Sequence, residues 1–230
     1  MKYHLEFDIE FKRNPYKGQY IVLEGIDGSG KTTQIDLLYE YFRKQGKEVI
    51  RTREPRKDEG LIGELIQKIL NGKTKVPSVA IQYLFSADRG MHHEELILPA
   101  LKAGKIVISD RCFWSAVPYG VLDLEQEFTD NTAKYILVSQ SILSMYHQFT
   151  APDITFYLDI PVNRAMDRLD KKPHDKEIYE EEKKILKAKE GYDWLLKEFP
   201  REFKVINGAR PVKDVTEEII DVISRLKIKD

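Results

Sequence analysis

Short apolar runs alternate with longer amphipathic stretches along most of the chain. The apolar runs have the length of buried strands, and several end in a glycine or a charged residue. The amphipathic stretches repeat their apolar residues every three to four positions, which is typical of helices that cover a sheet. This alternation predicts an α/β fold with a mostly parallel sheet flanked by helices. The predicted strands are 20–23, 48–52, 105–109, 154–158 and 203–206, and the predicted helices are 31–45, 61–70, 79–102, 177–197 and 212–226.

The first eleven residues follow a different pattern, because their apolar side chains recur at every second position. These apolar positions are Tyr3, Leu5, Phe7, Ile9 and Phe11. A period of two is typical of a strand with one buried face, and the Asn, Pro and Gly of residues 14–18 predict a turn after it. We therefore predict an extra antiparallel edge strand within residues 1–18, with a dimer contact as the alternative.

The composition favours one globular domain over residues 1–230, since no internal repeat or low-complexity linker divides the chain. The single cysteine, Cys112, cannot form an internal disulfide, which favours a reducing compartment. No signal-peptide pattern and no bilayer-length apolar stretch is visible, so we expect a cytoplasmic protein without a membrane partner. The 37 basic residues nearly balance the 38 acidic ones, which argues against a nucleic-acid polymer as partner.

A glycine-rich loop follows the first predicted strand and opens the first predicted helix. Residues 25–32 read GIDGSGKT and fit the phosphate-binding pattern G-x-x-x-x-G-K-[ST] in its expected strand-to-helix context. Backbone N–H groups of such a loop converge on phosphate oxygens, while the lysine reaches the β- and γ-phosphates and the hydroxyl holds Mg²⁺. The loop therefore predicts binding of a nucleoside triphosphate. The residues assigned to this site are Gly25, Ile26, Asp27, Gly28, Ser29, Gly30, Lys31, Thr32 and Thr33.

The class of P-loop protein can be narrowed by what the chain lacks. A GTPase needs an Asn-Lys-x-Asp signature, and no asparagine in the sequence is followed by lysine. Motor and helicase ATPases need extra modules for which 230 residues leave no room. A small kinase remains, in which a second pocket at the strand ends holds the phosphate acceptor.

Four further runs of residues stand out: three follow a predicted strand or lie on the helix between strands, and the fourth contains the strand predicted at 154–158. They read TREPR (52–56), ADRGMH (87–92), DRCFWSAVPYG (110–120) and PDITFYLD (152–159). Together with GIDGSGKTTQ (25–34), they resemble the thymidylate kinase (dTMP kinase) family. The family's runs read G-x-D-G-S-G-K-T-T-Q, T-R-E-P-G, A-D-R-x-x-H, D-R-Y-x-x-S-x-x-A-Y-Q and P-D-x-T-x-Y-L-D. The runs of this chain occur in the same order and with matching spacing over roughly residues 20–189.

The resemblance implies ATP- and Mg²⁺-dependent phosphorylation of dTMP to dTDP, and it assigns roles to the clusters. Arg53 and Arg111 would clamp the acceptor phosphate, for which the planar guanidinium is well suited. Asp110 would organise Mg²⁺ together with Thr32. The resemblance thus places Lys31, Arg53 and Asp110 among the catalytic residues.

The same resemblance implies how the acceptor nucleoside is held. Phe85 would stack on the pyrimidine, and Arg89, one helical turn later, would donate to its carbonyl. Asp27 would contact the sugar, and Tyr119 would lie under it and disfavour a 2′-hydroxyl. Ser115 is assigned to the same acceptor site.

A charged segment after the fourth predicted strand matches the family's mobile LID, at about residues 170–177. Arg168, just before it, corresponds to an arginine that flanks the adenine. The phosphate loop contains no arginine, and lysines replace the family's LID arginines, so Lys172 (or Lys171) is predicted to supply charge to the transferring phosphoryl group. Residues 207–210 follow the last predicted strand, where adenine binds in P-loop kinases.

The chain departs from the family pattern at several acceptor-site positions. Residues 56–59 replace a glycine pair, Cys112 replaces a tyrosine, Pro118 an alanine and Gly120 a glutamine. The missing glutamine removes a hydrogen-bond partner for the base, so acceptors such as dUMP, dCMP or thymidine remain alternatives. A non-catalytic P-loop binding protein is a further alternative. The resemblance also implies a homodimer.

Overall fold

The computed structural model describes residues 8, 10–57, 59–123, 142–171 and 178–226. Within these residues, five strands form one parallel sheet in the order β2-β3-β1-β4-β5. This arrangement confirms the predicted α/β fold with a parallel sheet. The strands are β1 (Gln19–Glu24), β2 (Val49–Arg53), β3 (Ile106–Asp110), β4 (Ile154–Asp159) and β5 (Phe203–Asn207).

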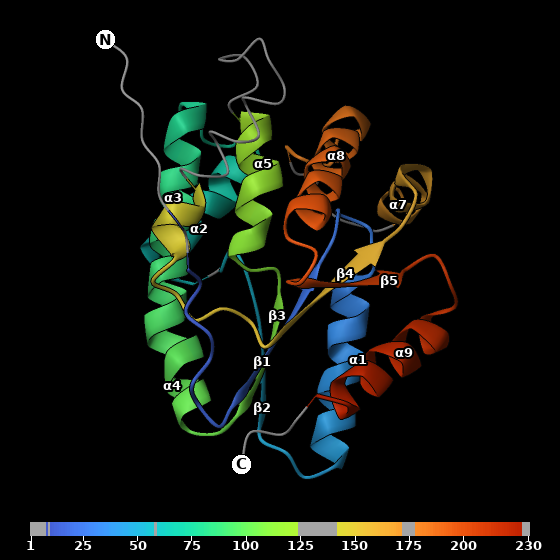
Figure 1. The fold of residues 1–230 in the computed structure, drawn as a ribbon. Helices are drawn as coiled ribbons and strands as arrows, with labels where there is room; N and C mark the ends of the chain where they lie inside the picture. Colours follow the sequence, from blue (N-terminus) through green and yellow to red (C-terminus); the bar gives the residue numbers. More distant parts are fainter. Residues whose placement is uncertain (1–7, 9, 58, 124–141, 172–177, 227–230) are drawn as a thin grey trace.

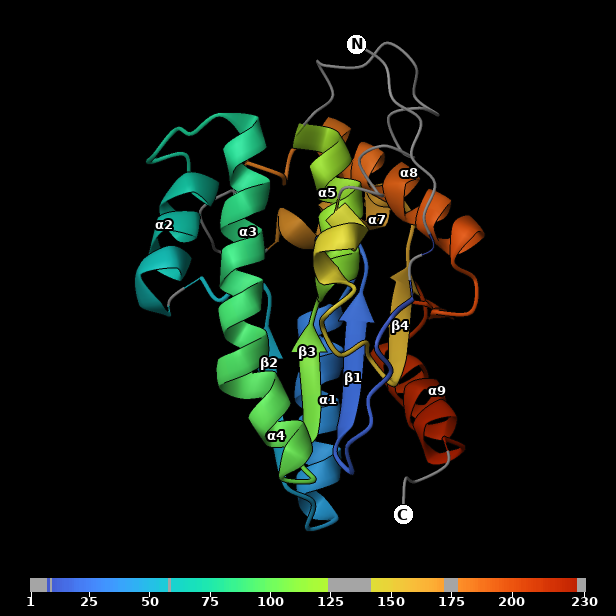
Figure 2. The ribbon, with the colours of Figure 1, turned by 60° about the vertical axis from the view of Figure 1, so that its left-hand side comes forward.

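Helices cover both faces of the sheet, as Figure 1 and Figure 2 show. On β1, Ile21 and Leu23 pack with α1 and α9 on one face, whereas Tyr20 and Val22 face the opposite core. Successive strand residues point to opposite faces, so a strand that is apolar throughout requires a helical layer on each side. The helices are α1 (Lys31–Lys44), α2 (Gly60–Leu70), α3 (Ser78–His92), α4 (Leu98–Lys102), α5 (Ala116–Asp123), α7 (Val162–Leu169), α8 (Glu182–Glu198) and α9 (Val212–Ser224).

Parallel pairing brings the carboxyl ends of the strands to one edge of the sheet. Arg53 of β2 lies opposite Asp110 of β3, and Leu23 of β1 pairs with the same residue from the other side. The loops that follow these three strands are therefore neighbours, although they are far apart in the sequence. This edge is where ligands bind in open α/β sheets.

The helix predicted over 79–102 is helical from Ser78 to Lys102, but its middle part is not an α-helix. Its residues His93–Ile97 adopt a π-helix between α3 and α4. Pro99, in the first turn of α4, has no N–H to donate to the preceding turn, which accounts for the irregular stretch.

Three helices differ from the sequence-based prediction. Helix α5 was not predicted, because Pro118 and Gly120 suggest a turn; Pro118 lies in the first helical turn, where no N–H is needed. Helix α7 was not predicted either, and the helix expected over 177–197 begins only at Glu182.

The predicted N-terminal strand lies largely outside the described residues. Of its apolar positions, only Phe11 is described, and its ring packs 5.7 Å from Phe113 and 5.3 Å from Trp114, measured between ring centroids. Nearby, Lys12 forms a single parallel bridge to Thr150. Residues 8 and 10–18 thus add no strand to the sheet. No helix in the described part of the chain is long and apolar enough to cross a membrane.

Candidate active site

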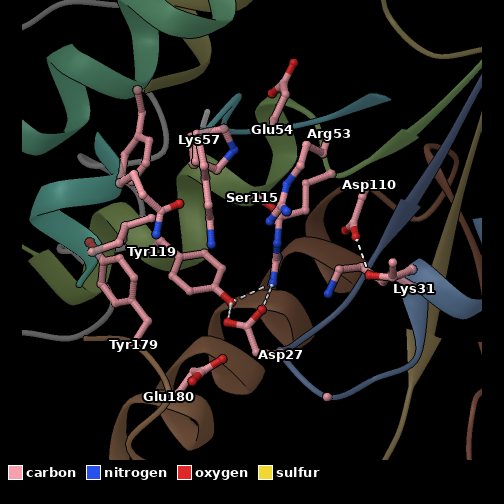
Figure 3. Close-up of a pocket in the computed structure, with 18 of the residues that line it drawn as sticks. Asp27, Lys31, Arg53, Glu54, Lys57, Asp110, Ser115, Tyr119, Tyr179 and Glu180 are labelled. Carbon is pink, nitrogen blue, oxygen red and sulfur yellow. Dashed lines mark hydrogen bonds and ion pairs between the residues drawn. The ribbon is translucent and has the colours of Figure 1, made fainter. Parts of the chain in front are cut away.

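A cavity of about 410 Å³ opens at the carboxyl ends of β1, β2 and β3, and Figure 3 shows the side chains that line it. Its walls come from the phosphate loop, the loop after β2, and helices α2, α3 and α5. The cavity has the size of a small-molecule site. Thirteen of the predicted site residues line it: Asp27, Gly28, Gly30, Lys31, Thr32, Thr33, Arg53, Phe85, Arg89, Asp110, Arg111, Ser115 and Tyr119.

The phosphate loop is held in a shape that glycine permits. Gly28 and Gly30 have φ angles of 79° and 101°, which side chains other than glycine rarely adopt. A Cβ on Gly28 would also lie 2.5 Å from the carbonyl oxygen of Ala165 in α7. Lys31 Nζ donates to the carbonyl oxygens of Gly25 and Ile26, both at 3.1 Å. The loop backbone thus holds the ammonium group in a defined place.

Burial of Lys31, reinforced by the nearby positive charge of Arg111, lowers the pKa of its ammonium to about 8. In the nucleotide-free protein the group is charged below this pH and neutral above it, whereas a bound triphosphate would restore the charge. The dissociation constant for Mg-ATP is therefore expected to rise about tenfold between pH 7 and pH 9. Calorimetric titration at both pH values measures this change. The variant Lys31→Arg, which stays charged, should lose the pH dependence, and equal wild-type affinities at both pH values would contradict the prediction.

Thr32 and Asp110 form an oxygen pair beside the phosphate loop. The Thr32 hydroxyl donates to Asp110 Oδ2 over 3.0 Å. Both are hard oxygen ligands of the kind that Mg²⁺ prefers, and Mg²⁺ takes its other ligands from substrate phosphates and water. The described residues contain no cluster of three or more His, Cys, Asp or Glu side chains that could enclose a metal by themselves. The pair therefore fits a metal that arrives with its nucleotide.

Arg111, the residue after β3, connects several predicted acceptor-site residues. Its φ angle of 77° is unusual for an arginine and turns the side chain under the cavity. Its Nη2 donates to Asp27 Oδ1 at 2.6 Å, and its Nη1 donates to the Ser115 and Tyr192 hydroxyls at 3.0 and 2.8 Å. The Tyr119 hydroxyl donates to Asp27 Oδ2 at 3.0 Å. Figure 3 shows Tyr119 and Asp27 facing each other across the floor of the cavity.

The Arg111 cluster keeps Asp27 ionised. Burial alone would raise the pKa of the Asp27 carboxyl, but the charges of Arg111 and Lys31 outweigh burial and hold the pKa well below its ordinary value. The carboxylate can therefore accept hydrogen bonds across the physiological pH range.

Glu24, the last residue of β1, holds the cluster from beneath and was not identified from the sequence. Its carboxylate is fully buried and accepts from the Cys112 N–H at 2.9 Å, the Ser115 hydroxyl at 2.6 Å and the Tyr192 hydroxyl at 2.7 Å. Arg111 Nη1 lies 3.9 Å from it. A charged residue that closes an otherwise apolar strand directly before a phosphate loop is the signal that could have revealed it.

Helix α3 brings Phe85 and Arg89 to the cavity, as predicted from their spacing. Arg89 is more constrained than the sequence suggests, because its Nε donates to Glu54 at 2.5 Å and its Nη1 to the Tyr146 hydroxyl at 2.6 Å. His92 contacts the other oxygen of Glu54 at 3.1 Å. Burial would raise the pKa of Glu54, but Arg89 and His92 lower it. This buried network holds Arg89 in one orientation.

Arg53 differs from the other two arginines of the cavity. It ends β2, is exposed and lines the cavity. Among the described residues it has no ion-pair partner, whereas Arg89 is paired with Glu54 and Arg111 with Asp27. An exposed guanidinium at a strand end, beside a phosphate loop, is available to an incoming anion.

Arg168, which is predicted to flank the adenine, contacts the phosphate loop. Arg168 donates from Nη1 to the carbonyl oxygens of Gly28 and Ser29 at 3.3 and 3.0 Å, and from Nη2 to that of Gly208 at 3.0 Å. It thereby joins the phosphate loop to the 207–210 loop where adenine is expected.

The predicted LID, residues 170–177, is described only in part. Lys172 and most of the predicted LID lie outside the described residues, whereas Lys171 is described. Tyr179 and Glu180 line the cavity, and both precede α8 instead of belonging to the helix predicted over 177–197. Tyr179 packs edge-on against Tyr119, with ring centroids 5.1 Å apart.

The chain is similar to known proteins over most of its length. Residues 23–219 match the family model for thymidylate kinase. A probable thymidylate kinase from Thermococcus kodakarensis is 38% identical over 222 residues, which cover 90% of this chain and 98% of that protein. A thymidylate kinase from Thermoanaerobacter pseudethanolicus is 37% identical over 211 residues, which cover 91% and 98%. The solved structure of thymidylate kinase from Candida albicans shares the fold, with a TM-score of 0.76, 24% identity and coverage of 92% of this chain and 93% of that one. The chain belongs to the thymidylate kinase family.

Proposed function

We propose that this protein transfers the γ-phosphoryl group of ATP to dTMP, giving dTDP and ADP. Membership of the family makes the chain a nucleotide-binding phosphotransferase. The observation that carries the choice of acceptor site is that Lys31, Arg53 and Arg111 line one cavity. A phosphate-loop lysine beside two arginines suits a second, phosphorylated substrate, because a nucleoside acceptor has no phosphate for the arginines to bind.

In the proposed reaction, a phosphate oxygen of dTMP attacks the γ-phosphorus in line with the departing ADP oxygen. The acceptor phosphate is already ionised, so no side chain has to remove a proton. The two phosphate groups repel each other, and Arg53 and Arg111 offset this repulsion while they fix the attacking oxygen. Lys31 exchanges its two carbonyl contacts for phosphate oxygens and stabilises the charge that develops on the leaving group.

Thr32 and Asp110 would hold the Mg²⁺ that accompanies ATP. When bound, this ion neutralises charge on the β- and γ-phosphates. On the donor side, we assign Arg168 to the adenine and Lys172 of the LID to the transferring group. We also propose a cytoplasmic homodimer, as the family resemblance implies.

The acceptor nucleoside is proposed to lie between α3 and Tyr119. Phe85 would stack on the pyrimidine, and Arg89 would donate to its carbonyl. A guanidinium can donate but cannot accept a hydrogen bond, so it suits thymine or uracil better than the amino group of cytosine. Asp27 and Tyr119 would contact the sugar, and Ser115 belongs to the same site.

The test is ADP release from Mg-ATP with dTMP, dUMP, dCMP, dGMP, the ribonucleotide TMP and thymidine. We expect the fastest turnover with dTMP and about tenfold slower turnover with dUMP, since one missing methyl group costs about 1–3 kcal/mol of discrimination. Faster turnover with another acceptor would overturn the base assignment. If no acceptor released ADP, the alternative of a non-catalytic P-loop binding protein would be favoured.

A further inference from the structure

The loop after β2 is anchored to α3 by Arg56, one of the residues that replace the family's glycine pair. The Arg56 side chain is buried, and its Nε and Nη1 donate to Asp88 at 3.3 Å and to Glu95 at 2.9 Å. Its backbone N–H also donates to Asp88 Oδ2 at 2.9 Å. Burial would lower the pKa of Arg56, but these acidic partners raise it. Charged hydrogen bonds to Asp88 of α3 and to Glu95 of the adjoining π-helix fix this point of the loop.

The same loop is held on its other side by α2. A Cβ on Gly63 would lie only 1.9 Å from the Arg56 carbonyl oxygen, so the helix and the loop touch through a position that needs glycine. Two turn hydrogen bonds, from Lys57 N–H to Pro55 O at 3.0 Å and from Glu59 N–H to Arg56 O at 3.1 Å, close the loop. The backbone of Lys57 is therefore held at a defined position between the two helices.

From this position the Lys57 side chain enters the cavity. It lines the cavity with Arg53, and Figure 3 shows it extending toward Tyr119. Tyr119 is hydrogen-bonded to Asp27 of the phosphate loop. Arg111 Nη2 also donates to the Tyr119 hydroxyl at 3.0 Å, so Lys57 points to the part of the cavity where Arg111 lies.

We infer that Lys57 is a further substrate-binding residue, which contacts the 5′-phosphate of the acceptor together with Arg53 and Arg111. The inference rests on the proposed function, because it assumes a nucleoside monophosphate in this cavity. A lysine ammonium is a compact point charge on a flexible stem, so it can bind a phosphate oxygen left over by two planar guanidinium groups. In this loop, Arg56 holds the backbone in place, and its neighbour Lys57 contacts the substrate.

The test compares binding of dTMP and of thymidine, measured by calorimetry without ATP. Lys57→Met keeps the length and apolar stem of the side chain and removes its charge. We expect dTMP to bind about 10- to 100-fold more weakly, as for one charged hydrogen bond, and thymidine to bind as to the wild type. Lys57→Arg should retain affinity for dTMP within about threefold. Lys68→Met, on the exposed side of α2, is the matched control and should change neither ligand's binding.

Equal weakening of dTMP and thymidine would overturn the inference, because Lys57 would then shape the cavity rather than bind phosphate. Unchanged binding of dTMP to Lys57→Met would overturn it as well. If the wild type itself bound no dTMP, the proposed function would fail instead. The melting temperature of each variant shows whether a loss of binding comes from unfolding.

Discussion

Replacing Arg111 with methionine is expected to lower kcat/KM for dTMP about 10²- to 10³-fold and the free energy of unfolding by about 3 kcal/mol. The activity loss follows from removal of a charged group proposed to bind the acceptor phosphate. The stability loss has a separate cause in the free protein, where Arg111 faces Asp27 at 2.6 Å and Glu24 at 3.9 Å. Without Arg111, these carboxylates lose their cationic partner in a largely buried site.

Arg53→Met separates the expected activity loss from the expected stability loss. Arg53 is exposed and has no ion pair with a described residue, so its loss should lower kcat/KM for dTMP by a similar factor and leave stability within about 0.5 kcal/mol of the wild type. Steady-state kinetics with varied dTMP and denaturant unfolding measure the two effects. Arg111→Met with wild-type stability would contradict the structural role of Arg111, and Arg53→Met with wild-type kcat/KM would contradict the phosphate clamp.

The sheet and the phosphate loop were predictable because each is encoded locally. Buried parallel strands require short apolar runs, so the predicted strand 20–23 and the observed β1 differ by one residue at each end. The loop at 25–32 follows that strand immediately, and its glycines serve a conformation that few other residues adopt. Because parallel strands end at one edge, the convergence of Arg53 and Asp110 also followed from the predicted order of elements.

The buried residues that hold the arginines of the cavity in place could not be predicted in this way. Glu24 and Tyr192 share a hydrogen bond across 168 positions of the sequence, and no local pattern links the end of β1 to the middle of α8. Similarly, Tyr146 meets Arg89 across 57 positions. Each partner is polar and has an ordinary local context, so its role depends on the tertiary packing. Local residue preferences also gave a wrong prediction at α5. Pro118 suggests a turn there, but it occupies a helical position that needs no N–H.

Glu24→Gln is expected to lower the free energy of unfolding by about 2–4 kcal/mol, although the two side chains have nearly the same shape. The Glu24 carboxylate accepts from one backbone N–H and two hydroxyls. A glutamine has one oxygen and an NH₂ group, so either the Cys112 N–H would face another donor or both hydroxyls would have to turn and accept from the NH₂, in a fully buried site. The negative charge near Arg111 would also be lost. For a chain of this length, we expect the melting temperature to fall by about 4–16 °C.

Two variants test whether this effect belongs to the buried cluster. Glu48→Gln removes a carboxylate whose side chain is 74% exposed and which pairs with Lys105, so its stability should stay within about 0.5 kcal/mol of the wild type. Tyr192→Phe removes one hydroxyl of the cluster and should cost about 1 kcal/mol. Because Arg111 loses part of its support, KM for dTMP should also rise in Glu24→Gln. If Glu24→Gln were as stable as Glu48→Gln and kept the wild-type KM, Glu24 would not be the group that holds Arg111 and Ser115 beneath the acceptor site.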